Sequence, residues 1–458
     1  MRELLGETES LCPVCLRRIL AKKVADDGKV YLEKTCPEHG EYKVLIWRRD
    51  AKHYLDWTEG SEKGSGPVRS FTTVDKGCPY DCGLCPEHWT RACTMVLELT
   101  LRCNLGCPVC FASADKNREH EPNLDTIRGM YEATMEGVGA CTIQLSGGEP
   151  TLRNDLPQIV ALGRKVGFNH ILINTNGVRI AQEPDYLRHV KESGASAIYL
   201  QFDGVSDDVY RYTRGQNLFD IKRRALDNCA KERIGVILVP TIIPGVNDRQ
   251  LGDIVQFAKH WIPIVKGVHF QPISYFGRYP HPPGDEDRIT IPDVIDALES
   301  QTEGELKSDD FLPRHAQDSH CSFSSFFILT EQGKLQALSN LARGRVTGWG
   351  SCVGGSCAEL PPEESSRRFM SRHWRLDESC CQPGARDDFY EQVLNYYLTI
   401  TCMPFQDVWS LDLDRLRGCC GHVVTQDRRI IPFCAYYLTS SSGERLYTGS
   451  TAEVKIPK

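Results

Sequence analysis

The sequence lacks a long uninterrupted apolar run. The longest, Gly235 to Val246, is broken by Pro240 and Pro244, whereas a membrane-spanning helix needs about 20 apolar residues. The first ten residues also lack the apolar core of a signal peptide. We therefore expect a cytoplasmic protein with no integral membrane segment.

An excess of positive charge is also missing. The chain has 54 Lys and Arg against 61 Asp and Glu, which gives a net charge of −7. Nucleic-acid binding that depends on phosphate neutralisation needs a basic surface, so we expect no nucleic-acid partner. Hydrophobic residues at 41% and charged residues at 25% are typical of globular proteins, which excludes a disordered or fibrous chain.

Cysteine, in contrast, is abundant, with 21 in 458 residues. In a chain without an export signal, such cysteines serve more often as metal ligands than as disulfide partners. Ten lie between Cys12 and Cys110, two more are Cys141 and Cys229, and nine lie from Cys321 to Cys434. A metal-rich head and a cysteine-rich tail therefore flank a middle that is poor in cysteine.

The middle of the chain alternates between strand-like and helix-like segments. Apolar or β-branched runs occur at Met95–Leu101, Cys141–Leu145, His170–Asn174, Ala197–Phe202, Val236–Ile242 and Val268–Ile273. Amphipathic stretches such as Leu156–Val166 and Asp185–Glu192 lie between them. This alternation predicts a parallel sheet, and six units indicate a partial or complete barrel. Catalytic side chains would then gather at the carboxyl ends of the strands.

The strongest motif is a CxxxCxxC loop formed by Cys103, Cys107 and Cys110, directly after the first of these strands. Three thiolates at this spacing can hold three corners of a 4Fe–4S cluster and leave the fourth iron open. A closed zinc site would need a fourth ligand nearby. The second strand is followed by Ser146-Gly-Gly-Glu-Pro-Thr151, whose glycines let the backbone approach a ligand closely.

Together these motifs resemble those of the radical S-adenosylmethionine (SAM) superfamily, whose CxxxCxxC loop follows the first strand of a (β/α)6 partial barrel. The resemblance implies an α/β fold with a TIM-like partial barrel, in which Cys103, Cys107 and Cys110 are the catalytic cluster ligands. It also implies that the open iron binds SAM and that an electron from the cluster cleaves SAM to a 5′-deoxyadenosyl radical. The SAM-binding residues expected from it are Phe111, Ser146, Gly147, Gly148, Glu149, Pro150, Asn174, Asn176, Gln201 and Gln271.

A second CxxxCxxC set, Cys78, Cys82 and Cys85, lies upstream, and no clear strand precedes it. It is followed by His88 and Cys93, either of which could supply a fourth ligand. Four thiolates would close the cluster, so we assign Cys78, Cys82, Cys85 and Cys93 to an auxiliary 4Fe–4S cluster. A structural zinc site that uses His88 is the alternative.

The head of the chain contains two metal-binding knuckles. Cys12 and Cys15 form the first, and Cys36 and His39 form the second. Strand-like residues 29–34 and 41–47 lie beside the second knuckle and are expected to pair as a hairpin. The arrangement predicts a zinc-ribbon or rubredoxin-like domain that holds zinc or a single iron.

The tail offers ligands for a third cluster. The candidates are Cys402, Cys419 or Cys420, and Cys434, with Cys321 as a further one. Adjacent Cys380 and Cys381 are not expected to be ligands, since no partner motif lies nearby, and Cys352 and Cys357 are left unassigned. One or two auxiliary clusters are therefore expected in addition to the SAM-binding one.

Four motifs occur in this order: the head knuckles, the segment from Cys78 to Cys93, the radical SAM core and the cysteine-containing tail. Together they resemble one particular family that includes the archaeal tetraether lipid synthase and a radical SAM methylase of a pterin. We expect four parts: a metal domain (1–58), a linker with the auxiliary-cluster segment (59–94), the barrel (95–300), and a C-terminal α+β domain that binds a cluster and the substrate (301–458). The segment from about Pro280 to Thr401 carries no family motif.

The resemblance implies a radical SAM enzyme that forms a C–C bond or adds a methyl group at an unactivated carbon of a small-molecule or lipid substrate. Its partners would be that substrate and an electron donor of the ferredoxin or flavodoxin type. A radical SAM maturase that modifies a peptide is the alternative. A non-catalytic iron–sulfur or zinc carrier is a third reading, which the SGGEP motif and the barrel pattern disfavour.

Overall fold

The computed structural model describes residues 2–58, 66–118, 121–314, 316–338, 362–376, 395–448 and 453–454. The four cysteines Cys352, Cys357, Cys380 and Cys381 therefore lie outside the described residues. Within the described ranges, no helix has both the length and the apolar character needed to cross a membrane.

The N-terminal part is a four-stranded antiparallel sheet in sequence order. Its strands are β1 (Glu3–Leu11), β2 (Arg18–Asp26), β3 (Lys29–Cys36) and β4 (Gly40–Trp47), followed by helix α1 (Ala51–Asp56). The predicted hairpin is formed by β3 and β4. We did not predict β1 and β2, because their charged and polar residues break the apolar alternation on which strand prediction depends.

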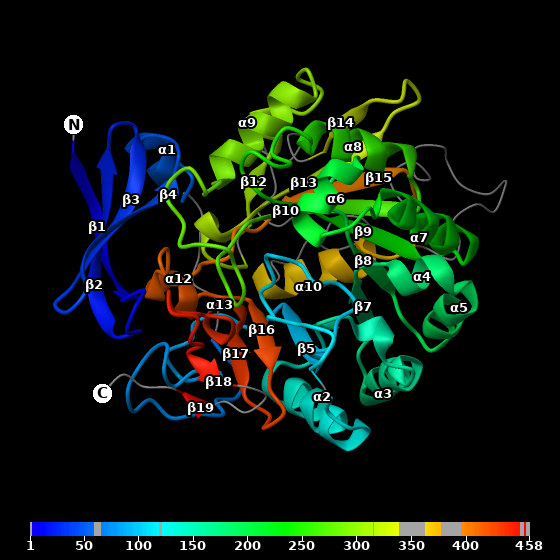
Figure 1. Ribbon diagram of the computed structural model, residues 1–458, viewed down its shortest axis with the longest axis horizontal. Coiled ribbons are helices and arrows are strands. Elements are labelled where there is room, and N and C mark those ends of the chain that lie inside the picture. The colour runs from blue at the N-terminus through cyan, green and yellow to red at the C-terminus, as the bar shows by residue number, and fades with distance from the viewer. Residues whose placement is uncertain are drawn as a thin grey trace, which may run out of the picture.

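The middle of the chain forms the predicted parallel sheet (Figure 1). Its strands are β5 (Thr94–Thr100), β6 (Thr142–Gly147), β7 (His170–Thr175), β8 (Ala197–Gln201), β9 (Gly235–Val239) and β11 (Val265–Pro272). Each of the six predicted runs is a strand. The fifth run ends early at Pro240, which has no N–H for the sheet, and continues as the short β10 (Thr241–Ile242).

Helices connect these strands and cover the outside of the sheet (Figure 1). They are α2 (Leu124–Val138), α3 (Leu156–Val166), α4 (Val178–Gln182), α5 (Pro184–Glu192), α6 (Asp207–Arg214), α7 (Phe219–Lys231), α8 (Leu251–His260) and α9 (Ile291–Gln301). The predicted helix over 156–166 is α3 and that over 185–192 is α5. Their apolar faces pack on the sheet, as the buried Leu156, Ile159 and Val160 of α3 show.

The tail adds strands to both edges of this sheet. Strand β15 (Tyr397–Cys402) pairs parallel with β11, and β16 (Gly421–Val424) pairs parallel with β5. Eight parallel strands thus form the wall, and within the described residues β15 and β16 do not pair with each other. The barrel is therefore partial, and part of its wall comes from the segment that we expected to be a separate C-terminal domain.

The remaining elements flank the wall. They are β12 (Leu312–Pro313), β13 (Phe323–Leu329), β14 (Leu335–Ala337), β17 (Ile430–Pro432), β18 (Tyr447–Thr448), β19 (Glu453–Val454), α10 (Pro362–His373), α12 (Leu413–Arg417) and α13 (Phe433–Tyr436). Short 3-10 turns lie at Pro150–Leu152, Ser308–Asp310 and Ser319–Cys321.

Helix α10 lies at the amino end of the barrel. Its Arg367 donates hydrogen bonds to the carbonyl oxygens of Ala92 and Val138, which lie just before β5 and at the end of α2. The Thr94 hydroxyl at the start of β5 lies 3.7 Å from the Met370 sulfur of α10. This helix therefore forms a floor under the barrel interior.

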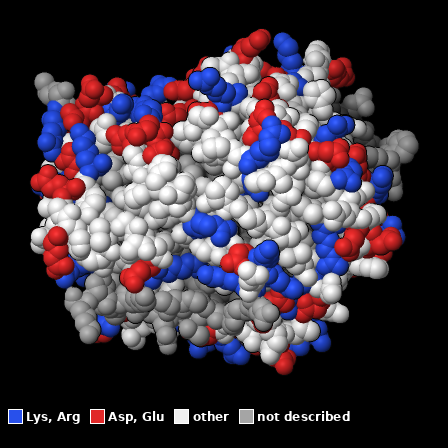
Figure 2. Space-filling view, in the orientation of Figure 1, with Lys and Arg blue, Asp and Glu red and all other residues white. Residues whose placement is uncertain are grey.

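The N-terminal sheet is attached to the tail through buried polar contacts. The ammonium group of Lys34, fully enclosed, donates to the Ser10 hydroxyl at 2.9 Å and to the Val408 carbonyl at 2.8 Å. Lys23 forms a 2.6 Å ion pair with Asp412. On the face shown in Figure 2, charged side chains of both signs lie mainly toward the edges, and most of the centre is uncharged.

Candidate active site

A cavity of about 270 Å³ occupies the inside of the barrel. The interior of a parallel barrel is normally filled by side chains, so a hollow of this size marks a binding site. The predicted residues that line it are Cys103, Cys107, Cys110, Phe111, Ser146, Gly147, Gly148, Glu149, Asn174, Asn176, Gln201 and Gln271. Pro150 is buried beside it and begins a 3-10 turn.

The loop of three cysteines is held in place by two arginines. Cys110 and Arg278 exchange backbone hydrogen bonds of 2.9 and 3.0 Å. The Arg278 side chain donates to the carbonyls of Cys107 and Ala114, and Arg445 donates to the carbonyl of Phe111 at 2.8 Å. The loop conformation is therefore set by the protein itself, which suits a preorganised cluster site.

The three thiols suit an iron–sulfur cluster. Burial raises the pKa of the Cys103 thiol to about 12, and a bound metal would favour its thiolate form. A 4Fe–4S cluster bound by Cys103, Cys107 and Cys110 would lie at the mouth of the cavity.

The glycine motif is fastened to the end of β5. Gly147 has φ +115°, and a Cβ there would lie 2.3 Å from the Thr100 carbonyl oxygen, so only glycine fits. The next two amide groups donate to the carbonyls of Thr100 at 2.7 Å and Arg102 at 2.9 Å. The motif that follows β6 therefore sits against the start of the cysteine loop.

Glu149 is buried, and its carboxylate accepts hydrogen bonds from neighbouring groups of the protein. It accepts hydrogen bonds from the hydroxyls of Thr151 at 2.5 Å and Thr175 at 2.7 Å, and from the amide of Asn176 at 2.7 Å. Burial raises the pKa of Glu149, and these hydrogen bonds oppose the rise. The carboxylate thus fixes the loop after β7, which carries Asn176.

Two side-chain amides each leave one polar atom without a partner among the described residues. Asn174 donates to Gln144 at 3.0 Å, and its carbonyl oxygen is unpaired. Gln201 accepts from the Lys222 ammonium at 2.7 Å, and its NH₂ group is unpaired. The cavity wall therefore presents one acceptor and one donor to a ligand. The Asn176 side chain, in contrast, donates a hydrogen bond to the side-chain oxygen of Asn104 at 2.7 Å.

Three further residues of the site, Arg214, Asp203 and Lys222, were not among the predicted ones, and of these Arg214 lines the cavity. Arg214 binds the buried carboxylate of Asp203 through two hydrogen bonds, of 2.6 and 2.9 Å, and its guanidinium also interacts with the Cys107 thiol. Burial lowers the pKa of Lys222 to about 7. Lys222 could have been noticed, since it lies on the apolar face of α7 with Ala225 and Leu226. A single sequence contains no comparable signal for Arg214.

The head cysteines form a compact metal-binding group. Of the described residues, Cys12, Cys15, Cys36 and His39 are the set whose ligand atoms all lie within 4.8 Å of one another. The sulfurs of Cys15 and Cys36 are 4.0 Å apart, and the Cys36 sulfur is 3.4 Å from the His39 Nδ1. Two sulfurs bound tetrahedrally to zinc at about 2.3 Å lie roughly 3.8 Å apart. The group therefore fits a tetrahedral ion.

The upstream CxxxCxxC set is brought together only in part. The thiols of Cys78 and Cys82 are hydrogen-bonded, and Cys85 interacts with them. The structure does not bring Cys93 to this group. The His88 ring faces away as well, since its Nε2 lies 2.8 Å from the Cys419 carbonyl.

Cys93 instead lies beside Cys420 at the floor of the cavity. The Cys93 amide donates to the Cys420 carbonyl at 2.7 Å, and the two thiols are hydrogen-bonded. Both residues line the cavity. Because they stand at the starts of the paired strands β5 and β16, only the tertiary structure makes them neighbours.

In the tail, the structure brings together Cys321, Cys419 and Cys434. These three thiols interact with one another, and Arg415 donates to the Cys321 sulfur at 3.3 Å. Cys402 is not part of this group, because it lies in the apolar core of the sheet. Of the candidate ligands for the third cluster, Cys321, Cys419 and Cys434 therefore lie together. Cys402 and Cys420 lie elsewhere.

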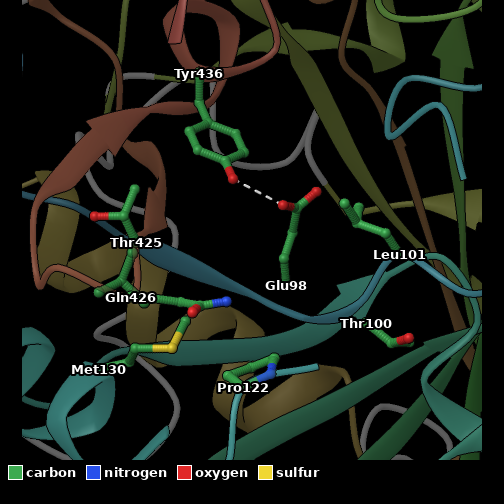
Figure 3. A pocket seen from close by; sticks show the side chains of 9 residues that line it. Glu98, Thr100, Leu101, Pro122, Met130, Thr425, Gln426 and Tyr436 are labelled. Atoms are coloured by element: carbon green, nitrogen blue, oxygen red, sulfur yellow. Dashed lines mark hydrogen bonds between the residues drawn. The ribbon is translucent and has the colours of Figure 1, made fainter. Parts of the chain in front are cut away.

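This group is linked to the catalytic loop through helix α13. Glu98 of β5 accepts hydrogen bonds from Tyr436 at 2.7 Å and Tyr437 at 2.8 Å. Figure 3 shows the first of these beside a small cavity of about 20 Å³. Tyr437 packs edge-on against Phe111, with ring centroids 4.8 Å apart. The helix that carries Cys434 is thereby joined to β5 and to the residue after Cys110.

Comparison with known proteins agrees with this arrangement. Residues 4–48 match the HMPTM N-terminal zinc ribbon domain, and residues 97–258 match the radical SAM superfamily. The chain is 36% identical over 472 residues to a 7,8-dihydro-6-hydroxymethylpterin dimethyltransferase of Methanocaldococcus jannaschii, covering 94% of this chain and 93% of that one.

Other matches are confined to part of the chain. An Fe-coproporphyrin III synthase of Methanosarcina barkeri is 37% identical over 149 residues, which is 32% of this chain and 36% of that one. The coproporphyrinogen III oxidase of Escherichia coli, a radical SAM enzyme, matches with a TM-score of 0.32 and 16% identity over 49% of this chain and 54% of that one.

The parallel barrel with a CxxxCxxC loop at its mouth defines a radical SAM enzyme, which binds SAM and a 4Fe–4S cluster. More narrowly, the chain belongs to the family of radical SAM methyltransferases that carry an N-terminal zinc ribbon. The predicted partial-barrel fold and the predicted enzyme class are confirmed.

Proposed function

We propose that this enzyme methylates a pterin. The relative that is similar over nearly its whole length is named as a dimethyltransferase of 7,8-dihydro-6-hydroxymethylpterin. The observation that carries the proposal is the 270 Å³ cavity, which begins at the three cysteines and continues into the barrel. A pterin ring has several amide-like donors and acceptors, and the unpaired atoms of Asn174 and Gln201 complement such edges.

The polar lining supports a small heterocycle over a lipid. Gln144, Tyr199, His269 and Gln271 line the cavity together with Asn174 and Gln201. An alkyl chain would leave the unpaired atoms of Asn174 and Gln201 without hydrogen-bond partners. A peptide maturase, the alternative considered from the sequence, is not supported by the full-length relative.

When bound, the cluster would supply the electron that cleaves SAM to a 5′-deoxyadenosyl radical. The chain's own residues bind and orient the reactants. Cys103, Cys107 and Cys110 would hold the cluster, the SGGEP segment would approach SAM through its backbone, and Arg214 would lie beside the Cys107 thiolate. The enclosed barrel would exclude water and competing hydrogen donors from the radical.

The test uses the anaerobically reconstituted protein with SAM, dithionite and 7,8-dihydro-6-hydroxymethylpterin. A methylene-tetrahydropterin is also added, so that the test contains a one-carbon donor other than SAM. We expect 5′-deoxyadenosine and a pterin product heavier by one or two methyl groups. Cys107→Ala should form neither. If the wild type forms 5′-deoxyadenosine but leaves the pterin unchanged, the pterin assignment is wrong.

We propose zinc at Cys12, Cys15, Cys36 and His39, since one nitrogen and three sulfurs at these distances suit that ion. We also propose two auxiliary 4Fe–4S clusters, one at Cys78, Cys82 and Cys85 and one at Cys321, Cys419 and Cys434. Two groups of three interacting cysteines, one on a single loop and one drawn from separate segments, support this assignment.

We further propose a ferredoxin- or flavodoxin-type electron donor. Arg278 and Arg445 border the cysteine loop and would attract the acidic surface of such a protein. The test is the rate of cluster reduction by reduced flavodoxin in stopped-flow experiments. The rate should fall as salt is raised from 50 to 500 mM, and a rate independent of salt would contradict the proposal.

A further inference from the structure

The cavity runs through the barrel from one end to the other. Cys103 follows β5 and Cys93 precedes it, and both line the same cavity. A strand of seven residues spans roughly 23 Å at about 3.3 Å per residue. The hollow thus has a mouth at the cysteine loop and a floor at α10, where Ser366, Met370 and Trp374 line it.

The charged side chains that line this cavity differ in whether they have a partner of opposite charge or other hydrogen-bonding groups. The charged residues that line it are Glu149, Arg214 and Arg314. Glu149 is occupied by hydroxyl and amide donors, and Arg214 is paired with Asp203. Arg314, at the floor, donates to the Ser366 hydroxyl, and among the described residues no carboxylate contacts it.

An unpaired guanidinium inside an enclosed cavity costs free energy unless an anion joins it. The groups near Arg314 are the thiols of Cys93 and Cys420 and the side chains of Tyr199 and His269. Burial lowers the pKa of His269 to about 3, so its imidazole is neutral and adds no second positive charge. Of the described residues that line the floor of the cavity, Arg314 is therefore the one cation, since Arg367 of α10 does not line the cavity and donates to backbone carbonyls.

Three rings stand beside this cation. The centroid of the Tyr199 ring is 5.8 Å from that of His269 and 6.0 Å from that of Trp374, and the last two are 6.0 Å apart. Aromatic walls of this kind contact planar ligands well. A floor with one guanidinium and three rings is complementary to a flat molecule that carries an anionic group.

We propose that Arg314 binds an oxyanion, a phosphate or a carboxylate, at the end of the substrate remote from its reacting carbon. The substrate is then an elongated heterocycle whose reacting end faces the cysteine loop and whose anionic end reaches the barrel floor. This inference rests on the proposed function for the identity of the heterocycle, and it adds the anionic group as the feature that Arg314 selects. Guanidinium groups bind both oxyanions through paired N–H donors.

The test is equilibrium binding to the anaerobically reconstituted protein, followed by pterin fluorescence. The probes are 7,8-dihydro-6-hydroxymethylpterin, its phosphate ester and pterin-6-carboxylate. The wild type should bind at least one anionic probe ten times or more tighter than the neutral pterin, which corresponds to about 1.4 kcal/mol. The preferred anionic probe tells phosphate from carboxylate.

Arg314→Gln should remove this preference, and Arg314→Lys should retain part of it. Arg69→Gln, which removes an exposed arginine paired with Glu136, is the matched control and should bind like the wild type. Iron content and circular dichroism establish that each variant is folded and loaded.

Equal binding of charged and neutral probes by the wild type, or no binding of either, would overturn the proposal. A preference that survives in Arg314→Gln would overturn it as well. Because binding is measured without turnover, a failure here is distinct from a failure to form 5′-deoxyadenosine or a methylated product, which tests the proposed function.

Discussion

Cys110 and Arg278 form a two-way backbone bridge, with hydrogen bonds of 2.9 and 3.0 Å. This bridge joins the catalytic loop to the segment after β11, on the opposite edge of the six central strands from β5. The Arg278 side chain then reaches back to the Cys107 carbonyl. The geometry of the three thiols therefore depends on residues about 170 positions later in the chain.

Gly277 makes this bridge possible, and Gly277→Ala should disrupt it. Gly277 has φ +56°, and a Cβ there would lie 2.5 Å from the Phe111 carbonyl oxygen and 2.7 Å from that of Cys110. We expect the variant to lose about four irons per chain, those of the SAM-binding cluster, and to form little 5′-deoxyadenosine. Gly106→Ala, in the same loop but with open space around its Cβ, should keep both. Full iron content in Gly277→Ala would contradict the prediction.

The iron content of two variants can distinguish a cluster ligand of the tail from a buried cysteine that binds no cluster. Cys434→Ala should lose about four irons per chain, because Cys434 lies with Cys321 and Cys419. Cys402→Ala should retain its iron, because Cys402 lies in the apolar core of the sheet. Mössbauer spectra and iron analysis of the two variants provide the measurement. Equal iron loss in both would show that this group is not a separate cluster site.

The upstream set allows a similar comparison. Cys82→Ala should lose a cluster, since its thiol is hydrogen-bonded to that of Cys78. Cys93→Ala should keep the cluster, because the Cys93 thiol is directed to Cys420. If Cys93→Ala loses as much iron as Cys82→Ala, the four-cysteine assignment made from the sequence is the correct one.

Lys222 should give the stability a measurable pH dependence. Burial lowers its pKa to about 7, whereas in the unfolded chain it stays near about 10.4. Above pH 7 the unfolded state thus binds more protons than the folded one, and stability rises with pH. From pH 7 to pH 9 the Tm of the wild type should rise by about 2–4 °C relative to that of Lys222→Met. Lys231→Met, which removes an exposed lysine of the same helix, should show no such change relative to the wild type.

The N-terminal metal site should hold its sheet together. Cys36→Ala should lose one zinc per chain and destabilise β1–β4, since a structural metal contributes directly to folding. Elemental analysis and limited proteolysis measure the two effects. Glu38→Gln, which changes an exposed residue between the two ligands of the second knuckle, should retain the zinc. One iron with visible thiolate absorption would show that the ion is iron.

Several parts of this molecule are encoded locally. The six strands of the barrel follow from apolar runs that alternate with amphipathic helices, and the Cys103 and SGGEP loops follow directly from the ends of two of them. The knuckles at Cys12 and Cys36 are equally local. Strands β1 and β2 could not be predicted, because their exposed faces are heavily charged. Strands β15 and β16 could not be assigned to the barrel, because no local pattern encodes the partner of a parallel strand.

By itself, the sequence determined the class of enzyme, and it supplied the proposed ligands of the catalytic cluster, because these three cysteines lie within eight residues on one loop. Only the tertiary structure decided which tail cysteines meet. It separated Cys93 from Cys78, placed Cys93 beside Cys420, and grouped Cys321 with Cys419 and Cys434, all through contacts between distant segments. It also placed Arg314 at the floor of the barrel. Such pairings depend on how strands and helices pack, and spacing along a chain does not record them.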